Sequence, residues 1–268
     1  MKHLMSESEL LRLADLNLTE FWCESSKWIP GTEIFEAQDT VFINSALGFP
    51  GCSLAFSLAT EQDERPDAFL SRTKAFFATR SKRSFSLLLR GHCDRALIQH
   101  CKDNGMFLVS ESPGMVLEEP IKGEAAPSGA ELHWVDNENE LQGFKQVVAE
   151  AYQDLAFPKE VSESYFAQAQ RVISPHFVLA VIHFKGEPAS TALAILSHGI
   201  AGVYWVGTIK KARGIGLAAY CTREVSNAAF ALGARKVVLQ ASKFGEPVYL
   251  KIGYREITRY PWFICPSK

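Results

Sequence analysis

One stretch late in the chain constrains the fold more than any other: residues 203–219, VYWVGTIKKARGIGLAA. An apolar run ends in a basic turn, glycines follow at Gly214 and Gly216, and a helix-forming sequence then begins. This pattern predicts a strand, a loop and a helix N-terminus, where free N–H groups and the helix dipole favour an anion. Glycine at both positions lets a ligand touch the backbone. We therefore expect this loop to hold a pyrophosphate.

The composition describes a chain that can bury a large core and has no bulk attraction to polyanions. Of its 268 residues 47% are hydrophobic, and the net charge is −2 at pH 7. The small charge argues against a nucleic-acid or membrane partner, and no apolar run approaches the ~18–20 residues that cross a bilayer. Glu7 and Glu9 stand where a signal peptide would be apolar. We expect a cytoplasmic protein, either a monomer or a homodimer.

The cysteines give no sign of a metal site or of a disulfide framework. All six are scattered, with no C-x-x-C pair and no zinc-ligand spacing. Disulfides are rare in the cytosol, so we predict small core residues, with Cys221 facing inward from the helix after the loop. No metal is predicted.

A change of composition divides the chain in two. Residues 118–130, EEPIKGEAAPSGA, are small, polar and rich in helix breakers, as in a linker. We predict an α/β domain over residues 1–122 and a second domain over 131–268. In the first, helices are predicted at 7–18, 65–77 and 93–104, and strands at 39–47, 52–59, 84–90, 107–110 and 115–118. In the second, helices are predicted at 138–152, 162–169, 217–232 and 247–252, and strands at 131–135, 177–184, 189–198, 203–208, 235–241 and 254–265. Because Pro261 interrupts the last strand, we expect that strand at a sheet edge.

Two common nucleotide motifs fit the glycine loop poorly. Gly214-x-Gly216-x-x-Ala219 matches the dinucleotide fingerprint, but the next strand ends at Ser242 without the carboxylate that would hold a ribose. No Gly-Lys-Ser/Thr follows the loop, so it is not a Walker motif.

The order of elements from residue 131 onward resembles the GNAT family of acetyl-CoA-dependent N-acetyltransferases. Arg213-x-x-Gly216-x-Ala218 matches the family's loop signature, and residues 239–254 resemble its second signature, which ends Tyr-x-x-x-Gly-aromatic at Tyr249 to Tyr254. The resemblance implies an α/β (α+β) fold with a mixed, mostly antiparallel sheet flanked by helices. The similar element order of the first half implies a tandem arrangement in which residues 1–122 are a degenerate second copy.

The resemblance also implies a reaction and its site. Acetyl-CoA would be the cosubstrate of an N-acetyltransferase that acts on the amine of a small molecule or peptide by direct transfer in a ternary complex. Tyr249 matches the tyrosine that protonates the departing thiolate. Acceptor contacts are expected from residues 152–165. The positions implied for coenzyme A are Val206, Gly207 and Thr208 for the pantetheine arm, Arg213, Gly214, Ile215, Gly216, Leu217 and Ala218 for the pyrophosphate, and Ser242.

The general base of that reaction has no obvious counterpart in the sequence. Family members often carry a Glu on the strand before the loop, whereas residues 202–208 contain no carboxylate. His183 and His198 lie on neighbouring predicted strands and have a suitable pKa, so both are candidates, and a water chain to solvent is the alternative. Tyr204 and Trp205 should point to opposite faces of their strand.

Two other functions remain open at this point. The missing Glu and the degenerate first half would suit a non-catalytic acyl-CoA-binding or regulatory module. The tandem halves also resemble Fem-type aminoacyl transferases, which use charged tRNA, but the mild net charge and the absence of a basic stripe count against that function.

Overall fold

The structure is a computed structural model that describes residues 5–37, 39–59, 65–123, 125–166 and 168–267. Within these residues eleven strands form one sheet, in the order β1-β2-β3-β4-β11-β5-β10-β9-β8-β7-β6. Neighbouring strands are antiparallel except in the β3–β4 and β9–β10 pairs, which are parallel. The predicted fold class, a mixed and mostly antiparallel sheet flanked by helices, is therefore confirmed.

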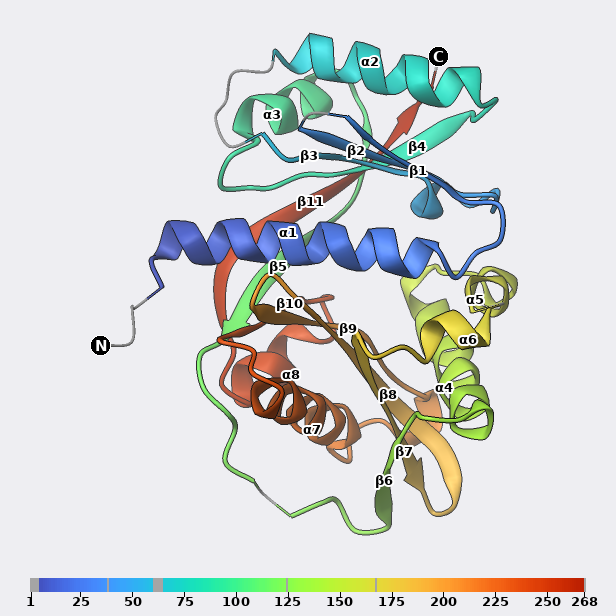
Figure 1. The fold of residues 1–268 in the computed structure, drawn as a ribbon, viewed down its shortest axis with the longest axis vertical. Coiled ribbons are helices and arrows are strands. Elements are labelled where there is room, and N and C mark those ends of the chain that lie inside the picture. The colour runs from blue at the N-terminus through green and yellow to red at the C-terminus, as the bar shows by residue number, and fades with distance from the viewer. Residues whose placement is uncertain (1–4, 38, 60–64, 124, 167, 268) are drawn as a thin grey trace.

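The first half of the chain opens with a long helix and then builds one end of the sheet (Figure 1). The helix starts where the Ser6 hydroxyl accepts a hydrogen bond from the Glu9 amide at 3.1 Å. The elements are α1 (Glu7–Ser26), β1 (Glu33–Ala37), β2 (Thr40–Asn44), the 3-10 turn η1 (Pro50–Cys52), β3 (Leu54–Ser57), α2 (Pro66–Thr79), β4 (Ser84–Leu88), α3 (Arg95–Asp103) and β5 (Phe107–Leu117).

The second half begins after residues 118–129 and supplies the other end of the sheet. Its first part comprises β6 (Ala130–Trp134), α4 (Glu138–Ala151), η2 (Tyr152–Leu155), α5 (Lys159–Tyr165), α6 (Ala169–Val172), β7 (Phe177–Phe184), β8 (Glu187–Ser197) and β9 (Ile200–Thr208). Its second part comprises η3 (Lys210–Ala212), α7 (Leu217–Ala231), β10 (Val237–Gln240), α8 (Glu246–Lys251) and β11 (Arg255–Pro266). The order of elements follows the prediction with three differences: β1 is added, the two strands predicted at 107–110 and 115–118 form the single strand β5, and the helix predicted at 162–169 is replaced by the two short helices α5 and α6.

The two halves exchange their last strands. After α3 the chain enters β5, which pairs with β10 of the second half, as in the register Met115–Leu239. After α8 the chain enters β11, which pairs with β4 of the first half, as in Trp262–Leu88. The exchanged strands β5 and β11 also pair with each other. Each half therefore completes its part of the sheet with a strand from the other.

The position of β11 corrects one prediction from the sequence. This strand lies in the middle of the sheet, between β4 and β5, and not at an edge. Pro261 is tolerated there because it lies just beyond the last β4 pair, Trp262–Leu88, where its carbonyl accepts from the Leu89 amide at 2.9 Å. The missing N–H of the proline thus falls at the end of a ladder.

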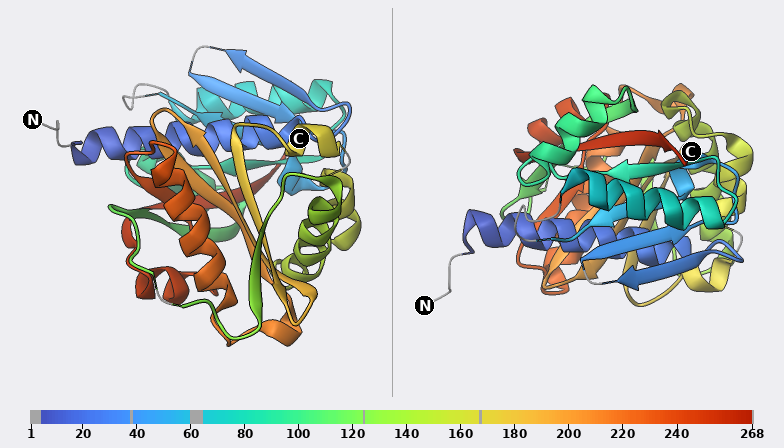
Figure 2. Two further views of the ribbon diagram at one scale, coloured as in Figure 1. Left: turned by 60° about the horizontal axis from the view of Figure 1, so that its bottom comes forward. Right: turned by 90° about the horizontal axis from the view of Figure 1, so that it is seen from above.

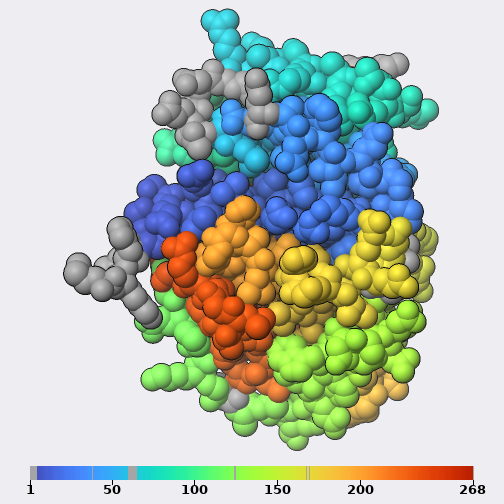
Figure 3. All heavy atoms as spheres, viewed as in Figure 1, coloured from blue at the N-terminus to red at the C-terminus, as the bar shows by residue number. Residues whose placement is uncertain are grey.

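Helices cover both faces of the second half of the sheet, and a hydrophobic core lies on each face. Successive residues of β7 point alternately into one core and the other. Leu179 and Val181 of β7 join the core under α4, whereas Ala180 and Ile182 join the core under α7. Helix α1 crosses the middle of the molecule and shares the α4 face, where its Phe21 packs against β9 (Figures 1 and 2). In the space-filling view α1 lies between the cyan part of the first half and the orange part of the second (Figure 3). Among the described residues, no helix combines the length and apolar character needed to span a membrane.

Candidate functional site

Strand β9 carries a bulge in its pairing with β8. Two residues, Trp205 and Val206, stand opposite one residue of β8, because the register runs from Tyr204–Leu193 to Gly207–Thr191. Trp205 has a φ of 50°, and its carbonyl accepts from the Thr191 hydroxyl at 3.0 Å.

The parallel pairing of β9 with β10 ends just before the bulge. Its last pair is Val203–Leu239, so residues 204–208 continue without a β10 partner. Val206, Gly207 and Thr208, the residues predicted for the pantetheine arm, therefore lie on a strand edge that β10 does not cover.

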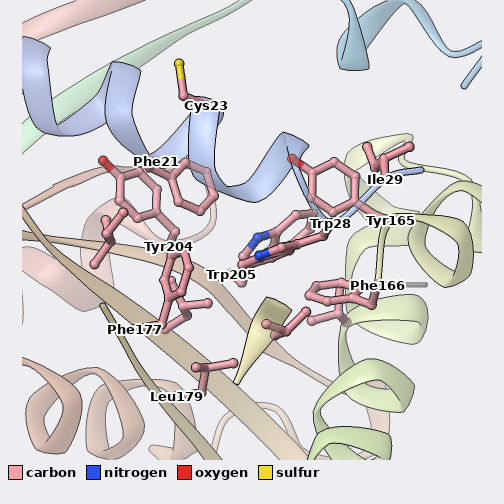
Figure 4. Close-up of a cluster of buried hydrophobic side chains, with 14 of the residues drawn as sticks. Phe21, Cys23, Trp28, Ile29, Tyr165, Phe166, Phe177, Leu179, Tyr204 and Trp205 are labelled. Atoms are coloured by element: carbon pink, nitrogen blue, oxygen red, sulfur yellow. The ribbon is translucent and has the colours of Figure 1, made fainter. Parts of the chain in front are cut away.

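The bulge also corrects the expected orientation of two aromatic residues. Tyr204 and Trp205 do not face opposite sides of the sheet: both belong to the core on the α4 side (Figure 4). Tyr204 stacks on Phe21 at 3.7 Å, and its hydroxyl donates to Asn17 at 3.0 Å. A bulge breaks the strict alternation of a strand, and the sequence carries no marker of it at this position.

The glycine loop has free space beside both of its glycines. Gly214 and Gly216 have φ values of 81° and 87°, which other residues rarely adopt. A Cβ added to Gly214 would meet nothing within 4 Å, and one added to Gly216 would meet only Pro127 at 3.8 Å. The loop leads into α7 at Leu217, so the first amides of that helix point toward this space.

Arg213 ties the loop to its surroundings. Its guanidinium donates to the Thr208 carbonyl at 3.0 Å and to the Asp154 carboxylate at 2.6 Å. The hydrogen bond from Arg213 holds the pKa of Asp154 below its ordinary value. Because both side chains are about half exposed, the pair is easily broken by a competing anion.

Tyr249 lies in α8, the short helix that follows β10. Its ring folds back over Gly245, where an added Cβ would come within 2.7 Å of it, and it is 7% exposed. Burial, together with the nearby Cys221 thiol, raises the pKa of Tyr249 well above its ordinary value. The phenol is therefore protonated at neutral pH, and it is a weaker acid than an ordinary tyrosine.

Tyr152 joins this group from the end of α4. Its pKa is raised by burial and further by the neighbouring Tyr249. An added Cβ on Gly207 would lie 3.3 Å from the Tyr152 ring, so Tyr152 stands beside the free edge of β9. Tyr152 was expected among the acceptor contacts, and its closeness to Tyr249 follows only from the tertiary structure.

Ser242 forms hydrogen bonds within the loop that leads into α8. Its hydroxyl accepts from the Gly245 amide at 3.2 Å, and its carbonyl accepts from the amides of Gly245 and Glu246 at 3.0 Å. These bonds position α8, and with it Tyr249, beyond the end of β10. Cys221 is fully buried in α7, as predicted.

The two histidines considered as general bases lie away from this group. His198 occupies the exposed turn between β8 and β9 with a φ of 53°. At about 3.3 Å per residue that turn is roughly 20 Å from Trp205. His183 lies on β7, which β8 separates from β9, so it stands about 10 Å from the strand edge. Its imidazole instead contacts Glu140 at 3.3 Å. The structure thus places neither ring beside Tyr249.

Comparison with known proteins gives matches in structure alone. No family model matches the sequence, and no curated protein matches it. A GCN5-related N-acetyltransferase from Kribbella flavida superimposes with a TM-score of 0.68, with 20% identity over 94% of each chain. One from Sphaerobacter thermophilus gives a TM-score of 0.64, with 17% identity over 90% of this chain and 84% of that one.

A third structural match concerns the division of the chain into two halves. A tandem GNAT protein from the clavulanic acid biosynthesis pathway superimposes with a TM-score of 0.59, with 13% identity over 90% of this chain and 85% of that one. The chain therefore has the fold of the GCN5-related N-acetyltransferases. More particularly, it resembles a tandem GNAT protein over most of its length, which confirms the predicted fold.

Proposed function

We propose that this chain is an acetyl-CoA-dependent N-acetyltransferase acting on the amine of a small molecule or peptide. The proposal rests on three features that we assign to one cofactor gap beside the β9 edge at residues 206–208. These are the unpaired edge of β9 at residues 206–208, the open glycine loop at residues 213–218 and the protonated phenol of Tyr249.

The cofactor would be held mainly by backbone groups. The pantetheine arm would pair with β9 as an added strand, and the pyrophosphate would lie on the amides of the loop and of the first turn of α7. The phosphate would compete with Asp154 for the guanidinium of Arg213. Binding the acceptor beside the thioester then removes much of the entropic barrier to its attack.

Proton transfer would involve Tyr249 and solvent. The amine attacks the thioester carbonyl, the C–S bond breaks, and the phenol of Tyr249 gives its proton to the departing thiolate. Neither histidine lies beside the gap, and residues 202–208 contain no carboxylate. We therefore infer that the attacking amine loses its proton to water that leads to solvent. The tyrosinate regains a proton from the same water.

Binding of acetyl-CoA is the first test. Calorimetric titration and thermal unfolding should show one acetyl-CoA bound per chain and a higher melting temperature. Ala218→Glu should abolish both effects, because a carboxylate in the first turn of α7 suits the helix dipole but repels a phosphate. Gly216→Glu should act likewise, with added backbone strain at its φ of 87°.

A control variant and a contradicting outcome complete this experiment. Gly48→Glu carries the same charge change to a position of the first half where an added Cβ meets nothing within 4 Å, and it should bind acetyl-CoA normally. Undiminished affinity in Ala218→Glu would contradict the assignment of the loop.

Turnover distinguishes an enzyme from a non-catalytic acyl-CoA-binding module. Release of free thiol from acetyl-CoA should depend on the amine in a panel of small amines and peptides. Tyr249→Phe should lower kcat by about 10²-fold with little change in the KM for acetyl-CoA. Normal acetyl-CoA binding without thiol release from any amine would favour the non-catalytic module.

A further inference from the structure

A cluster of two imidazoles and a carboxylate lies on the α4 face, apart from the proposed cofactor gap. Glu131 and His183 are cross-strand partners in the β6–β7 pair, and His133 follows two residues along β6 on the same face. Glu140 reaches them from the first turn of α4, which starts where the Asn137 side chain accepts from the Glu140 amide at 3.1 Å.

The ligand-type atoms of this cluster converge. The Glu140 carboxylate lies 3.0 Å from Nδ1 of His133 through one oxygen and 3.3 Å from Nε2 of His183 through the other. One such atom from each of the three residues lies within 4.8 Å of the others. The two imidazoles stack with 4.2 Å between centroids, so both rings present an edge to the same carboxylate.

Two of these atoms are buried without a hydrogen-bond partner in the described part of the chain. They are Nε2 of His183 and Oε2 of Glu140, and their 3.3 Å contact lacks hydrogen-bond geometry. Leaving such polar groups unsatisfied is costly. Bonds of about 2.0 Å to a tetrahedral ion would separate two ligand atoms by about 3.3 Å, which matches this contact.

The surroundings also suit a cation. Nδ1 of His133 forms a hydrogen bond with Oε1 of Glu140 in this structure, so a metal ion would replace the shared proton. Oε2 of Glu131 lies 3.8 Å from Nε2 of His133 and would face a proton on that nitrogen. Gly143 lets α4 pack closely on Pro188 beside the cluster, since an added Cβ would lie 3.2 Å from that ring. Glu131 and Glu140 give the cluster a negative charge when both imidazoles are neutral.

We propose that His133, Glu140 and His183 bind a divalent transition-metal ion, and that Zn²⁺ fits the ligand set best. Two imidazole nitrogens and one carboxylate favour Zn²⁺, Co²⁺ or Ni²⁺ over Mg²⁺ and Ca²⁺, which prefer all-oxygen sites. Three protein ligands leave a fourth position for water. The bound ion would join β6, β7 and α4, and this holds whether or not the chain transfers acetyl groups.

The test uses the full chain without a histidine tag, after treatment with a chelator. Calorimetric titration should show one Zn²⁺ per chain bound with micromolar or tighter affinity, and Co²⁺ should give the visible absorption of a four-coordinate site. Zn²⁺ should raise the melting temperature, and Mg²⁺ should leave it unchanged.

Variants locate the site. Glu140→Gln and His183→Gln should each weaken Zn²⁺ binding at least about tenfold and abolish the Co²⁺ spectrum. His176→Gln, an exposed histidine outside the cluster, should bind Zn²⁺ like the wild type. No uptake by the wild type, or equal affinity in wild type and Glu140→Gln, would overturn the proposal. Far-UV circular dichroism confirms that each variant is folded, and the near-isosteric Glu140→Gln decides the outcome if a histidine variant is not.

Discussion

At the scale of single residues, the pair between Arg213 and Asp154 bears on the proposed anion site. The Asp154 carboxylate lies in η2, directly after α4, and accepts from the Arg213 guanidinium at 2.6 Å. A bound pyrophosphate would meet both the attraction of Arg213 and the repulsion of Asp154. Replacing Asp154 would remove this repulsion without changing any residue of the loop.

We therefore expect Asp154→Asn to raise the affinity for coenzyme A. An exposed pair of charges is worth little, so the gain should be about two- to fivefold, and it should shrink as salt is added. Calorimetric titration at two ionic strengths measures both. Glu163→Gln removes the same charge from another exposed ion pair, on α5, and should change nothing. A loss of affinity in Asp154→Asn would show that the carboxylate supports the site.

The tyrosines make a second prediction at this scale. The pKa of every one of the seven is raised, chiefly by burial. Tyrosine is neutral below its ordinary pKa of about 10, so these groups contribute fully to stability at lower pH. That contribution is lost as the pH rises from about 10 toward the folded pKa values. Absorbance at about 295 nm should thus show delayed tyrosinate formation in the native protein compared with the unfolded chain, where ionisation centres near pH 10. Half-ionisation at pH 10 with a native circular dichroism spectrum would refute this.

At the scale of elements, the contact of α1 with β9 links the first half of the chain to the strand that we propose borders the cofactor. Asn17 accepts from the Tyr204 hydroxyl at 3.0 Å and donates to the Ser197 side chain at 2.8 Å. The helix can approach this closely because position 202 is glycine. A Cβ there would lie 1.9 Å from the Asn17 side chain and 2.6 Å from the Tyr204 hydroxyl.

Gly202→Ala should consequently push α1 from β9. Overpacking of this kind costs about 1–3 kcal/mol, which chemical denaturation would detect as a lower midpoint. Because Tyr204 directly precedes the bulge, the affinity for acetyl-CoA should fall as well. Gly48→Ala is the matched control: nothing lies within 4 Å of its added Cβ, and it should unfold within about 0.5 kcal/mol of the wild type.

At the scale of the whole molecule, the exchange of β5 and β11 makes the two halves interdependent. The predicted boundary near residues 118–130 does fall between strands, but the strand before it, β5, lies between β10 and β11 of the second half. Without β5, residues 131–267 would leave the facing edges of β10 and β11 unpaired. They would also expose the part of the hydrophobic core that Met115 covers. Unpaired strand edges of this kind favour aggregation.

We expect a fragment of residues 131–268 to be insoluble or unfolded, and a fragment starting at residue 105, which retains β5, to be the more soluble of the two. Expression, gel filtration and circular dichroism of both fragments measure this. A compact, cooperatively unfolding fragment 131–268 that binds acetyl-CoA would show that β5 is dispensable and that the second half is an autonomous domain.

Local patterns allowed the sequence to predict much of the fold and part of the site. The strand, loop and helix at residues 203–231, the open glycines and the place of Tyr249 in a short helix all follow from propensities and spacings within a few residues. The fold class followed from the order of elements, because sequential strands and helices usually pack as neighbours.

What depends on distant contacts was decided only by the tertiary structure. Pro261 indicated an edge strand, but the partner of β11 comes from about 150 residues earlier in the chain, which no local pattern encodes. The bulge at Trp205 depends on pairing with β8, and His183 meets Glu140 and His133 because α4 packs over β6 and β7. Sequence periodicity reports which face of an element is buried, whereas the partners on that face are chosen by packing of the whole chain.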